Sequence, residues 1–346
     1  NTMCGLAGIY NPKGVEQESL KKMTGSIAHR GPDAEGFFIH NNFGLAHRRL
    51  SIIDLSDAAN QPMQSSCGRY QMVFNGEVYN HQEIAEELGC TRKTTSDTEV
   101  ILEAFVKWGP SMVSKLNGMF TIAIVDTQQN TLFLCRDRLG IKPLFVYRKN
   151  RMLAFASELK AIVALKNEVQ LTVNHAAVPY FLHLGYIPEP ISIYTEVEKF
   201  PAGSWAVYNG SELKTKKYWS ASEKIKPAIL SDETEAKQQL KALLEKSVKR
   251  RLMSDVPFGT FLSGGIDSSL ITALAQNASS EKLKTFSIGF EDGKHNESAF
   301  AKKVAEHLDT EHHEFLLTEK DALNLVEDIL PQYDEPYADS SAIPTM

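Results

Sequence analysis

The octapeptide LSGGIDSS (residues 262–269) lies between a hydrophobic stretch, VPFGTFL, and an amphipathic one, SSLITALAQ. This order predicts a strand, a tight glycine turn and a helix. Two glycines let the backbone approach a ligand closely, and the N–H groups at the start of a helix attract anions. A plain turn with Ser268 or Ser269 capping the helix is the alternative. Asp267 favours a polyphosphate site, because a carboxylate there can bind the accompanying Mg²⁺.

Strands and helices alternate around this loop. A helix is expected from Asp232, which has Glu235 at capping-box spacing and is followed by apolar residues at helical intervals. After the loop come two further strand and helix pairs, at 283–290 with 297–308 and at 311–317 with 319–330. The pattern predicts a parallel α/β domain of about three units.

The first part of the chain has a different pattern. Short runs of β-branched and aromatic residues predict strands, and two amphipathic segments, 21–30 and 97–109, predict helices. The expected strands are at 6–10, 35–39, 70–76, 118–126, 131–137, 144–148 and 152–157. Strands outnumber helices, which favours layered α and β over a doubly wound sheet. The polar stretch 209–233 lacks periodicity and is expected to be a linker or surface crossing.

Composition narrows the class of protein. The chain has 346 residues, 42% of them hydrophobic and 23% charged, with a formal net charge of −6. These values and scattered basic residues argue against nucleic acid or an anionic membrane as the partner. No apolar run reaches the roughly 20 residues of a membrane span. Widely spaced cysteines favour a reduced, cytoplasmic protein over a disulfide framework. They are Cys4, Cys67, Cys90 and Cys135.

SGGIDSS resembles the pyrophosphate loop of the N-type ATP pyrophosphatases, and no GxxxxGK[ST] sequence is present to suggest a P-loop enzyme. Within that group, SDVPFGTFLSGGIDSS and KTFSIGF are similar to the glutamine-dependent asparagine synthetase B family. The resemblance implies a Rossmann-like, adenine-nucleotide α-hydrolase-like domain that uses ATP and Mg²⁺, with Asp267 at the metal and Ile288 contacting adenine through its backbone. It implies ATP-binding residues Phe261, Leu262, Ser263, Gly264, Gly265, Asp267, Ser268 and Ile288.

The start of the chain, MCGLAGIY, resembles the start of that family's class II glutamine amidotransferase domain. The resemblance implies an αββα layered fold of the Ntn-hydrolase type, in which Cys4 becomes the first residue once Met3 is removed. A free α-amine titrates near pH 8 and a thiol near 8.5, so each can exchange a proton with the other. We therefore expect Asn1–Thr2 to be a cloning scar, and expect little glutaminase activity while residues 1–3 remain. A buried structural cysteine is the alternative.

Further motifs of this resemblance follow in order: RGPD (30–33), HRRLSIID, FNGEVYN and TSDTEV. They imply that Arg49 binds the glutamine carboxylate, and that Asn75 and Gly76 form the oxyanion hole, Asn75 also contacting the substrate. Glu77 and Asp97 would hold the α-ammonium group. In isolation, NGE is typical of a hairpin turn and SDTE of a helix N-cap.

Three further motifs have structural interpretations. RDRLGIKPLF (136–145) and ASELKAI (156–162) also match the family, and we interpret them as fold or interface elements. Arg136 and Asp137 could equally form a structural ion pair. His312 and His313 lie on a predicted strand, where neighbouring side chains face opposite ways, so the pair alone does not predict a metal site.

The resemblance divides the chain into a leader (1–3), an amidotransferase domain (4–205), a linker (206–231) and part of a synthetase domain (232–346). The family's second phosphate loop and later catalytic residues are not in this sequence, so we expect an incomplete synthetase domain. The tail, DEPYADSSAIPT, resembles a broad bacterial branch that includes amidotransferases of polysaccharide and antibiotic pathways.

The resemblance thus implies ATP-dependent conversion of aspartate to asparagine, with glutamine as the ammonia donor and AMP and pyrophosphate released. It also implies an internal ammonia channel and, since family members are often dimers, a homodimer. The alternatives are an amidotransferase that acts on another carboxylate, a β-lactam-synthetase-like relative without glutaminase activity, and a non-catalytic scaffold.

Overall fold

The computed structural model describes residues 3–89, 91–223, 225, 230–291, 296–329, 331–339 and 341–345. The expected scar, Asn1–Thr2, and Cys90 lie outside the described residues. The chain forms two compact units: Asn1–Ile225 with Asp334–Ala338, and Lys226–Tyr333 with Asp339–Met346. The segment 334–338 therefore belongs to the first unit, although its place in the sequence suggested the second.

Two six-stranded sheets form the centre of the first unit, and all their strand pairs are antiparallel. The first sheet has the order β10 (Val197–Lys199), β8 (Phe145–Lys149), β9 (Met152–Ala156), β1 (Gly5–Tyr10), β3 (Phe43–Arg49) and β2 (Ala34–His40). The second has the order β12 (Leu213–Lys217), β11 (Ser204–Tyr208), β7 (Thr131–Arg136), β6 (Gly118–Asp126), β5 (Tyr70–Val78) and β4 (Met63–Gln64).

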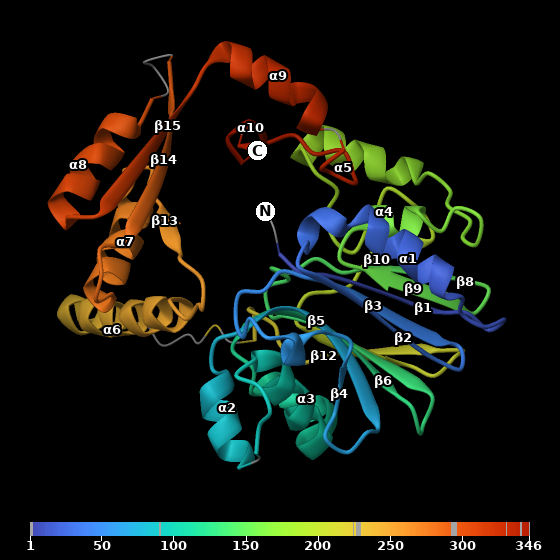
Figure 1. Ribbon diagram of the computed structural model, residues 1–346. Helices are drawn as coiled ribbons and strands as arrows, with labels where there is room; N and C mark the ends of the chain where they lie inside the picture. Colours follow the sequence, from blue (N-terminus) through green and yellow to red (C-terminus); the bar gives the residue numbers. More distant parts are fainter. Residues whose placement is uncertain are drawn as a thin grey trace. The chain divides into compact units, whose positions relative to one another are not determined.

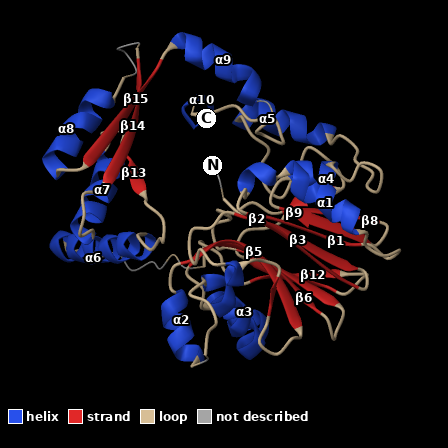
Figure 2. Ribbon diagram, viewed as in Figure 1, coloured by secondary structure: helices blue, strands red, loops and turns tan. Residues whose placement is uncertain are grey.

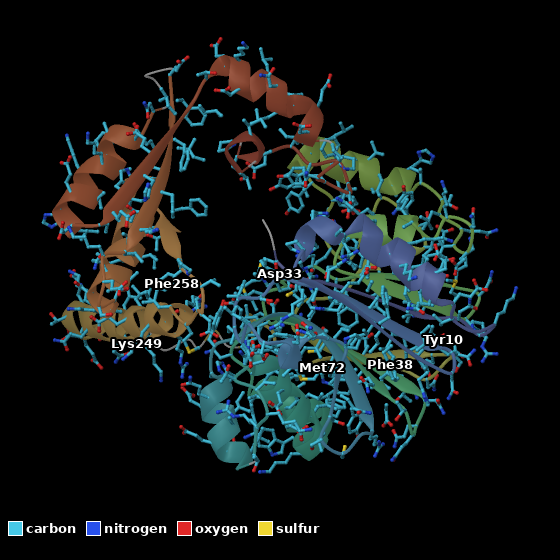
Figure 3. All side chains as sticks on the ribbon, viewed as in Figure 1. Tyr10, Asp33, Phe38, Met72, Lys249 and Phe258 are labelled. Carbon is cyan, nitrogen blue, oxygen red and sulfur yellow. The ribbon has the colours of Figure 1, made fainter. Side chains whose placement is uncertain are left out.

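Helices cover the outer face of each sheet (Figure 1). The first sheet packs against α1 (Gln17–Ser26) and α4 (Leu159–Val163), and the second against α2 (His81–Leu88) and α3 (Asp97–Trp108). A third core, between the sheets, is built from residues such as Leu45, Val125 and Phe155. Met72, labelled in Figure 3, faces the helices α2 and α3 from β5. The result is the expected αββα layering. The unit also contains α5 (Val178–Leu184) and short 3₁₀ turns at Ala28–Arg30, Asp57–Ala59, Gly109–Ser114 and His175–Ala177.

Strand β1 places the amino-terminal cysteine. All six of its residues are buried, because the strand lies inside the first sheet with a layer on each face. Such a strand is a continuous apolar run rather than an alternating one. Gly8 has no room for a side chain, since a Cβ there would lie 2.2 Å from the Phe155 ring. The strand thus fixes Cys4 at its amino-terminal end.

Every strand predicted in the first part of the chain is present, and both helices are confirmed. The expectation of a linker after residue 205 is wrong for its first part, because β11 and β12 form a hairpin within the second sheet. Strand β12 is at the sheet edge and four of its five residues are exposed. A solvated edge strand needs no apolar alternation, so this one had no hydrophobic signal.

The second unit contains a parallel sheet in the order β13 (Gly259–Phe261), β14 (Lys284–Phe290) and β15 (Glu311–Leu317) (Figure 2). Its helices are α6 (Glu233–Arg251), α7 (Ile266–Ala278), α8 (Ser298–Leu308), α9 (Glu319–Ile329) and α10 (Ala342–Thr345). Asp232 caps α6 by accepting the N–H groups of Thr234 and Glu235, which confirms the predicted helix start. Among the described residues, no helix is long and apolar enough to cross a membrane.

Candidate active site

One cavity in the first unit brings together all six residues that the glutaminase motifs predict. With its open mouth it encloses about 490 Å³. Its walls include Cys4, Arg49, Asn75, Gly76, Glu77 and Asp97, which come from separate parts of the sequence. The strands β1, β3 and β5 and the start of α3 position them. Leu50, Gln61, Phe74 and Thr98, which sequence reasoning did not select, complete much of the lining.

The Cys4 thiol is partly buried beside the loop that follows β3. Its Sγ accepts the Leu50 N–H at 3.3 Å and lies 3.5 Å from the Leu50 carbonyl oxygen. Burial raises the pKa of the Cys4 thiol and Asp97 adds to this, although the Leu50 backbone, Arg49 and Arg30 act in the opposite direction. The thiol is therefore protonated at neutral pH and needs a base before it can act as a nucleophile.

A buried lysine lies beside the same site. Lys142 Nζ is 2.7 Å from Met3 Sδ, and burial lowers the pKa of Lys142 to about 8 against the opposing effect of Glu77. Its motif, RDRLGIKPLF, is predicted from the sequence to be a fold or interface element. The spacing along the chain gave no indication of this position, because 139 residues separate Lys142 from Met3.

Asn75 and Gly76 lie within β5, paired with Thr121 and Phe120 of β6. The hairpin turn that NGE suggests is therefore wrong, because the triplet is in the body of a strand. Gly76 has φ +154°, and a Cβ there would lie 2.1 Å from the Met119 carbonyl oxygen. The Asn75 side chain is fully buried, and its Nδ2 donates to Ser157 Oγ at 3.4 Å. Its Oδ1 has no hydrogen-bond partner among the described residues.

Arg49 is buried at the end of β3, where the next loop folds over its guanidinium group. Nη1 donates to the Ser56 carbonyl and to Asn60 Oδ1, both at 2.8 Å, and Nη2 donates to the Asp54 carbonyl. These bonds fix the planar group at the cavity wall. A guanidinium held in this way is suited to forked recognition of a carboxylate.

Two carboxylates on the cavity wall have raised pKa values. Asp97 begins α3, and its Oδ2 accepts the Val78 N–H at 2.9 Å, while Ser96 caps the helix through the Thr98 N–H. Burial raises the pKa of Asp97 to about 6 despite these backbone bonds. Burial also raises the pKa of Glu77, and Asp97 adds to the effect. A bound cation would favour the charged form of both groups.

The RGPD motif supports the end of β3. A Cβ on Gly31 would lie 2.3 Å from the Arg48 carbonyl carbon, so the chain passes too close for any side chain. Asp33, labelled in Figure 3, accepts the Ser51 N–H at 2.7 Å, and its own N–H donates to the Arg49 carbonyl. These bonds hold the backbone at Arg49 and at Ser51, just after it.

The SGGIDSS loop in the second unit connects β13 to α7. Gly264 has φ +84°, and a Cβ there would lie 2.6 Å from the Ala301 nitrogen. Gly265 is the N-cap and provides no capping side chain. Ser268 and Ser269 instead donate back to the Gly265 carbonyl, at 3.1 and 2.7 Å. The alternative in which either serine caps the helix is therefore wrong, and the first N–H groups of α7 lack a side-chain cap.

A cavity of about 700 Å³, including its open mouth, lies next to this loop. Phe261, Leu262, Ser263, Ser268 and Ile288 line it, whereas Gly264, Gly265 and Asp267 do not. Asp267 is exposed in the first turn of α7. The described residues contain no group of three His, Cys, Asp or Glu side chains that could hold a metal ion. One carboxylate beside a polyphosphate site still fits Mg²⁺, which keeps several waters and takes its other ligands from phosphates.

The remaining motifs have structural partners. Arg136 pairs with Glu189 at 2.8 Å, and Asp137 accepts the backbone N–H groups of Leu139, Ile141 and Lys142. Of the histidine pair, His312 contacts Thr285 and Ser287, while His313 stacks on Phe286 and pairs with Glu311.

Comparison with known families gives two matches along the chain. A glutamine amidotransferase domain family matches residues 3–219, and an asparagine synthase family matches residues 239–346. Among solved structures, one titled as the allosteric regulatory enzyme of purine biosynthesis has a TM-score of 0.50 at 13% identity. It covers 91% of this chain and 80% of its own, and at this identity it supports the fold alone.

Several curated proteins are similar over nearly the whole chain. A Methanocaldococcus jannaschii protein, named provisionally as a glutamine-hydrolysing asparagine synthetase, is 38% identical over 99% of this chain and 70% of its own. The glutamine-hydrolysing asparagine synthetase 1 of Bacillus subtilis is 35% identical, and asparagine synthetase B of Escherichia coli is 32% identical. This chain spans 54% and 56% of those two proteins. With its Ntn-type amidotransferase fold, the chain belongs to the glutamine-hydrolysing asparagine synthetase family.

Proposed function

We propose that the first unit hydrolyses glutamine to glutamate and ammonia, and that the whole protein uses this ammonia with ATP to convert aspartate to asparagine. The observation that carries the proposal is the single cavity that holds Cys4, Arg49, Asn75, Gly76, Glu77 and Asp97. Hydrolysis of the side-chain amide of a free amino acid requires a nucleophile and donors to the oxyanion. Binding of its α-carboxylate and α-ammonium groups requires a cation and anions, and this cavity contains all of these groups.

Cys4 Sγ attacks the side-chain carbonyl carbon of glutamine while its proton passes to the base. With Met3 removed, the α-amine of Cys4 is that base, since its pKa near 8 suits proton transfer at neutral pH. Asn75 Nδ2 and the Gly76 N–H stabilise the developing oxyanion. The C–N bond then breaks, and the nitrogen takes up the proton and leaves as ammonia. Water hydrolyses the remaining thioester to release glutamate.

Arg49, Glu77 and Asp97 select a free amino acid. Arg49 binds the α-carboxylate, and Glu77 and Asp97 bind the α-ammonium group. The raised pKa values of Glu77 and Asp97 support this role, because a buried acid and a partly buried acid close together gain from a bound cation. Burial raises the pKa of Glu77, and the nearby Lys142 ammonium opposes this rise.

The second unit binds ATP next to the SGGIDSS loop. The uncapped N–H groups of α7 and the hydroxyl groups of Ser263 and Ser268 would hold the pyrophosphate portion, and Ile288 would contact adenine. Asp267 would bind Mg²⁺, which would offset the negative charge of the phosphates. An acceptor carboxylate oxygen attacks the α-phosphorus and pyrophosphate leaves; ammonia then attacks the acyl carbon and AMP leaves. The sequence of the tail, DEPYADSSAIPT, leaves another carboxylate as the alternative acceptor.

The test is an amide-synthesis assay on the natural full-length protein, processed to begin at Cys4. We expect aspartate-dependent release of pyrophosphate with either glutamine or free ammonia. The Cys4→Ala variant should lose only the glutamine-dependent reaction, because its synthetase half is unchanged. Pyrophosphate release that does not respond to aspartate would contradict the choice of acceptor. Equal use of glutamine by the variant would contradict the role of Cys4.

A further inference from the structure

A short segment late in the sequence is part of the first unit. Within residues 334–338, the Ala338 N–H donates to the Gly185 carbonyl at 2.8 Å. Glu335 accepts the Ile193 N–H at 2.8 Å and pairs with Lys199 at 2.6 Å. Asp334 pairs with Lys160 at 3.5 Å. Both acids are about nine-tenths buried, with side-chain exposures of 10% and 11%. The segment is thus held by buried charges as well as by its backbone.

From Lys160 a continuous chain of contacts leads to the candidate nucleophile. Lys160 Nζ lies 3.2 Å from Glu158 Oε2, and Glu158 Oε1 accepts Arg30 Nη1 at 2.7 Å. Arg30 Nε in turn donates to the Cys4 carbonyl oxygen at 3.1 Å. The aliphatic part of the Arg30 side chain also lies close to the backbone of Gly5, the residue after Cys4, since a Cβ on Gly5 would be 3.3 Å from Arg30 Cδ.

The charges along this chain alternate, and each side chain is largely buried. Asp334, Lys160, Glu158 and Arg30 have side-chain exposures of 10%, 22%, 14% and 11%. Burial acts to raise the pKa of Glu158, but Arg30, His29 and Lys160 outweigh it and hold the pKa below its usual value. Removing one member leaves its neighbour partly buried with less opposite charge around it, and the neighbour then shifts toward its remaining partners.

We propose that Glu158 and Lys160 are positioning residues. They connect the segment 334–338 to Arg30, which in turn fixes the position of the Cys4 backbone. The inference rests on the proposed glutaminase function. The segment falls within the residues matched to the asparagine synthase family, and the chain on both sides of it belongs to the second unit. A change in that unit that draws the segment away removes Asp334 from Lys160. The network would then reduce glutamine hydrolysis.

The test uses the full-length protein that begins at Cys4, with kcat and KM for glutamine hydrolysis measured separately. Lys160→Met and Asp334→Asn should lower kcat about tenfold, because small displacements of a reacting group reduce the rate steeply. KM should stay within about twofold, since the residues that bind glutamine are unchanged. Lys160→Arg keeps the charge and should restore most of the rate. The rate at which iodoacetamide alkylates Cys4 should also change in the Lys160→Met and Asp334→Asn variants.

Lys149→Met is the matched control. Lys149 forms a comparable ion pair with Glu196 at 2.8 Å in the same unit. Within the described part of the chain, this pair shares no hydrogen bond or ion pair with Asp334, Lys160, Glu158 or Arg30. The Lys149→Met variant should lose thermal stability without losing kcat. If the wild-type protein hydrolyses glutamine and the Lys160→Met variant is equally active, this inference is wrong, but the proposed function is unaffected. A wild-type protein that does not hydrolyse glutamine would overturn both.

Discussion

The Asp97 carboxylate accepts the Val78 backbone N–H at 2.9 Å and so ties the start of α3 to the end of β5. This bond joins the helix that carries one of the proposed substrate-binding acids to the strand that carries Asn75, Gly76 and Glu77. Because Asp97 is buried and its pKa is raised to about 6, the same carboxylate links the geometry of the site to pH.

Replacing Asp97 with asparagine should weaken glutamine binding. The amide oxygen can still accept the Val78 N–H, but the negative charge is lost. We expect KM for glutamine to rise about tenfold or more with little change in kcat, as for an interaction made equally in the ground and transition states. Steady-state glutaminase kinetics measure both constants. Glu87→Gln, which breaks an exposed ion pair with Lys115, should leave KM unchanged. If Asp97→Asn binds glutamine normally, Asp97 does not hold the ammonium group.

The free energy of unfolding of the protein without substrate should depend on pH because of Asp97. Its folded pKa, about 6, lies above the ordinary value of 3.8, so the folded state prefers the protonated form. The stabilisation of the folded state by protonated Asp97 is fully present below about pH 4 and is lost as pH rises through about 6. It amounts to up to about 3 kcal/mol. Denaturant unfolding of the wild type and Asp97→Asn at several pH values should show the difference narrowing toward low pH. A difference independent of pH would contradict the burial of a charged Asp97.

Gly76→Ala should disrupt the strand that carries the proposed oxyanion hole. The added Cβ meets the Met119 carbonyl oxygen at 2.1 Å, and φ +154° is unfavourable for alanine. We expect a loss of about 3 kcal/mol or more in the free energy of unfolding. Gly68→Ala is the control, because Gly68 also has positive φ, +73°, but its Cβ would meet nothing within 4 Å. That variant should lose about 1 kcal/mol. Similar losses in both variants would show that the β5–β6 contact is looser than described.

Gly264→Ala should abolish binding of ATP by the second unit. Its Cβ would lie 2.6 Å from the Ala301 nitrogen and from Phe300 Cβ, and φ is +84°. The loop must therefore move away from α8, which displaces the N–H groups at the start of α7. Isothermal calorimetry with MgATP tests this, with glutamine hydrolysis by the first unit as the internal control for folding. Unchanged ATP affinity would place the nucleotide elsewhere.

Local signals in the sequence were sufficient to predict much of this molecule. The alternation around LSGGIDSS gave the parallel sheet. The six residues that line one cavity were selected by the resemblance to a known family and not by a local signal. Local signals did not predict the edge strand β12, where solvent faces most side chains. They also suggested a turn at NGE, where pairing with β6 instead holds an extended strand through Gly76.

The supporting residues could not be found from the sequence because their partners are far away along the chain. Ser157 contacts Leu6 across 151 positions, and Glu158 contacts Arg30 across 128. Neither position has an amphipathic pattern or a spacing that points to a partner. Only the pairing of β9 with β1 in the first sheet brings Ser157 and Glu158 close to the start of the chain. The contact of segment 334–338 with the first unit was hidden for the same reason.

The central claim is that Cys4 is a nucleophile whose own α-amine is the base. The direct measurement compares glutamate release from glutamine, without ATP, by the protein that begins at Cys4 and by the same protein with Met3 still attached. We expect hydrolysis by the first form and a rate at least about a hundredfold lower in the second, since an amide nitrogen cannot accept the thiol proton. Equal rates in the two forms would contradict it, because another group would then be the base.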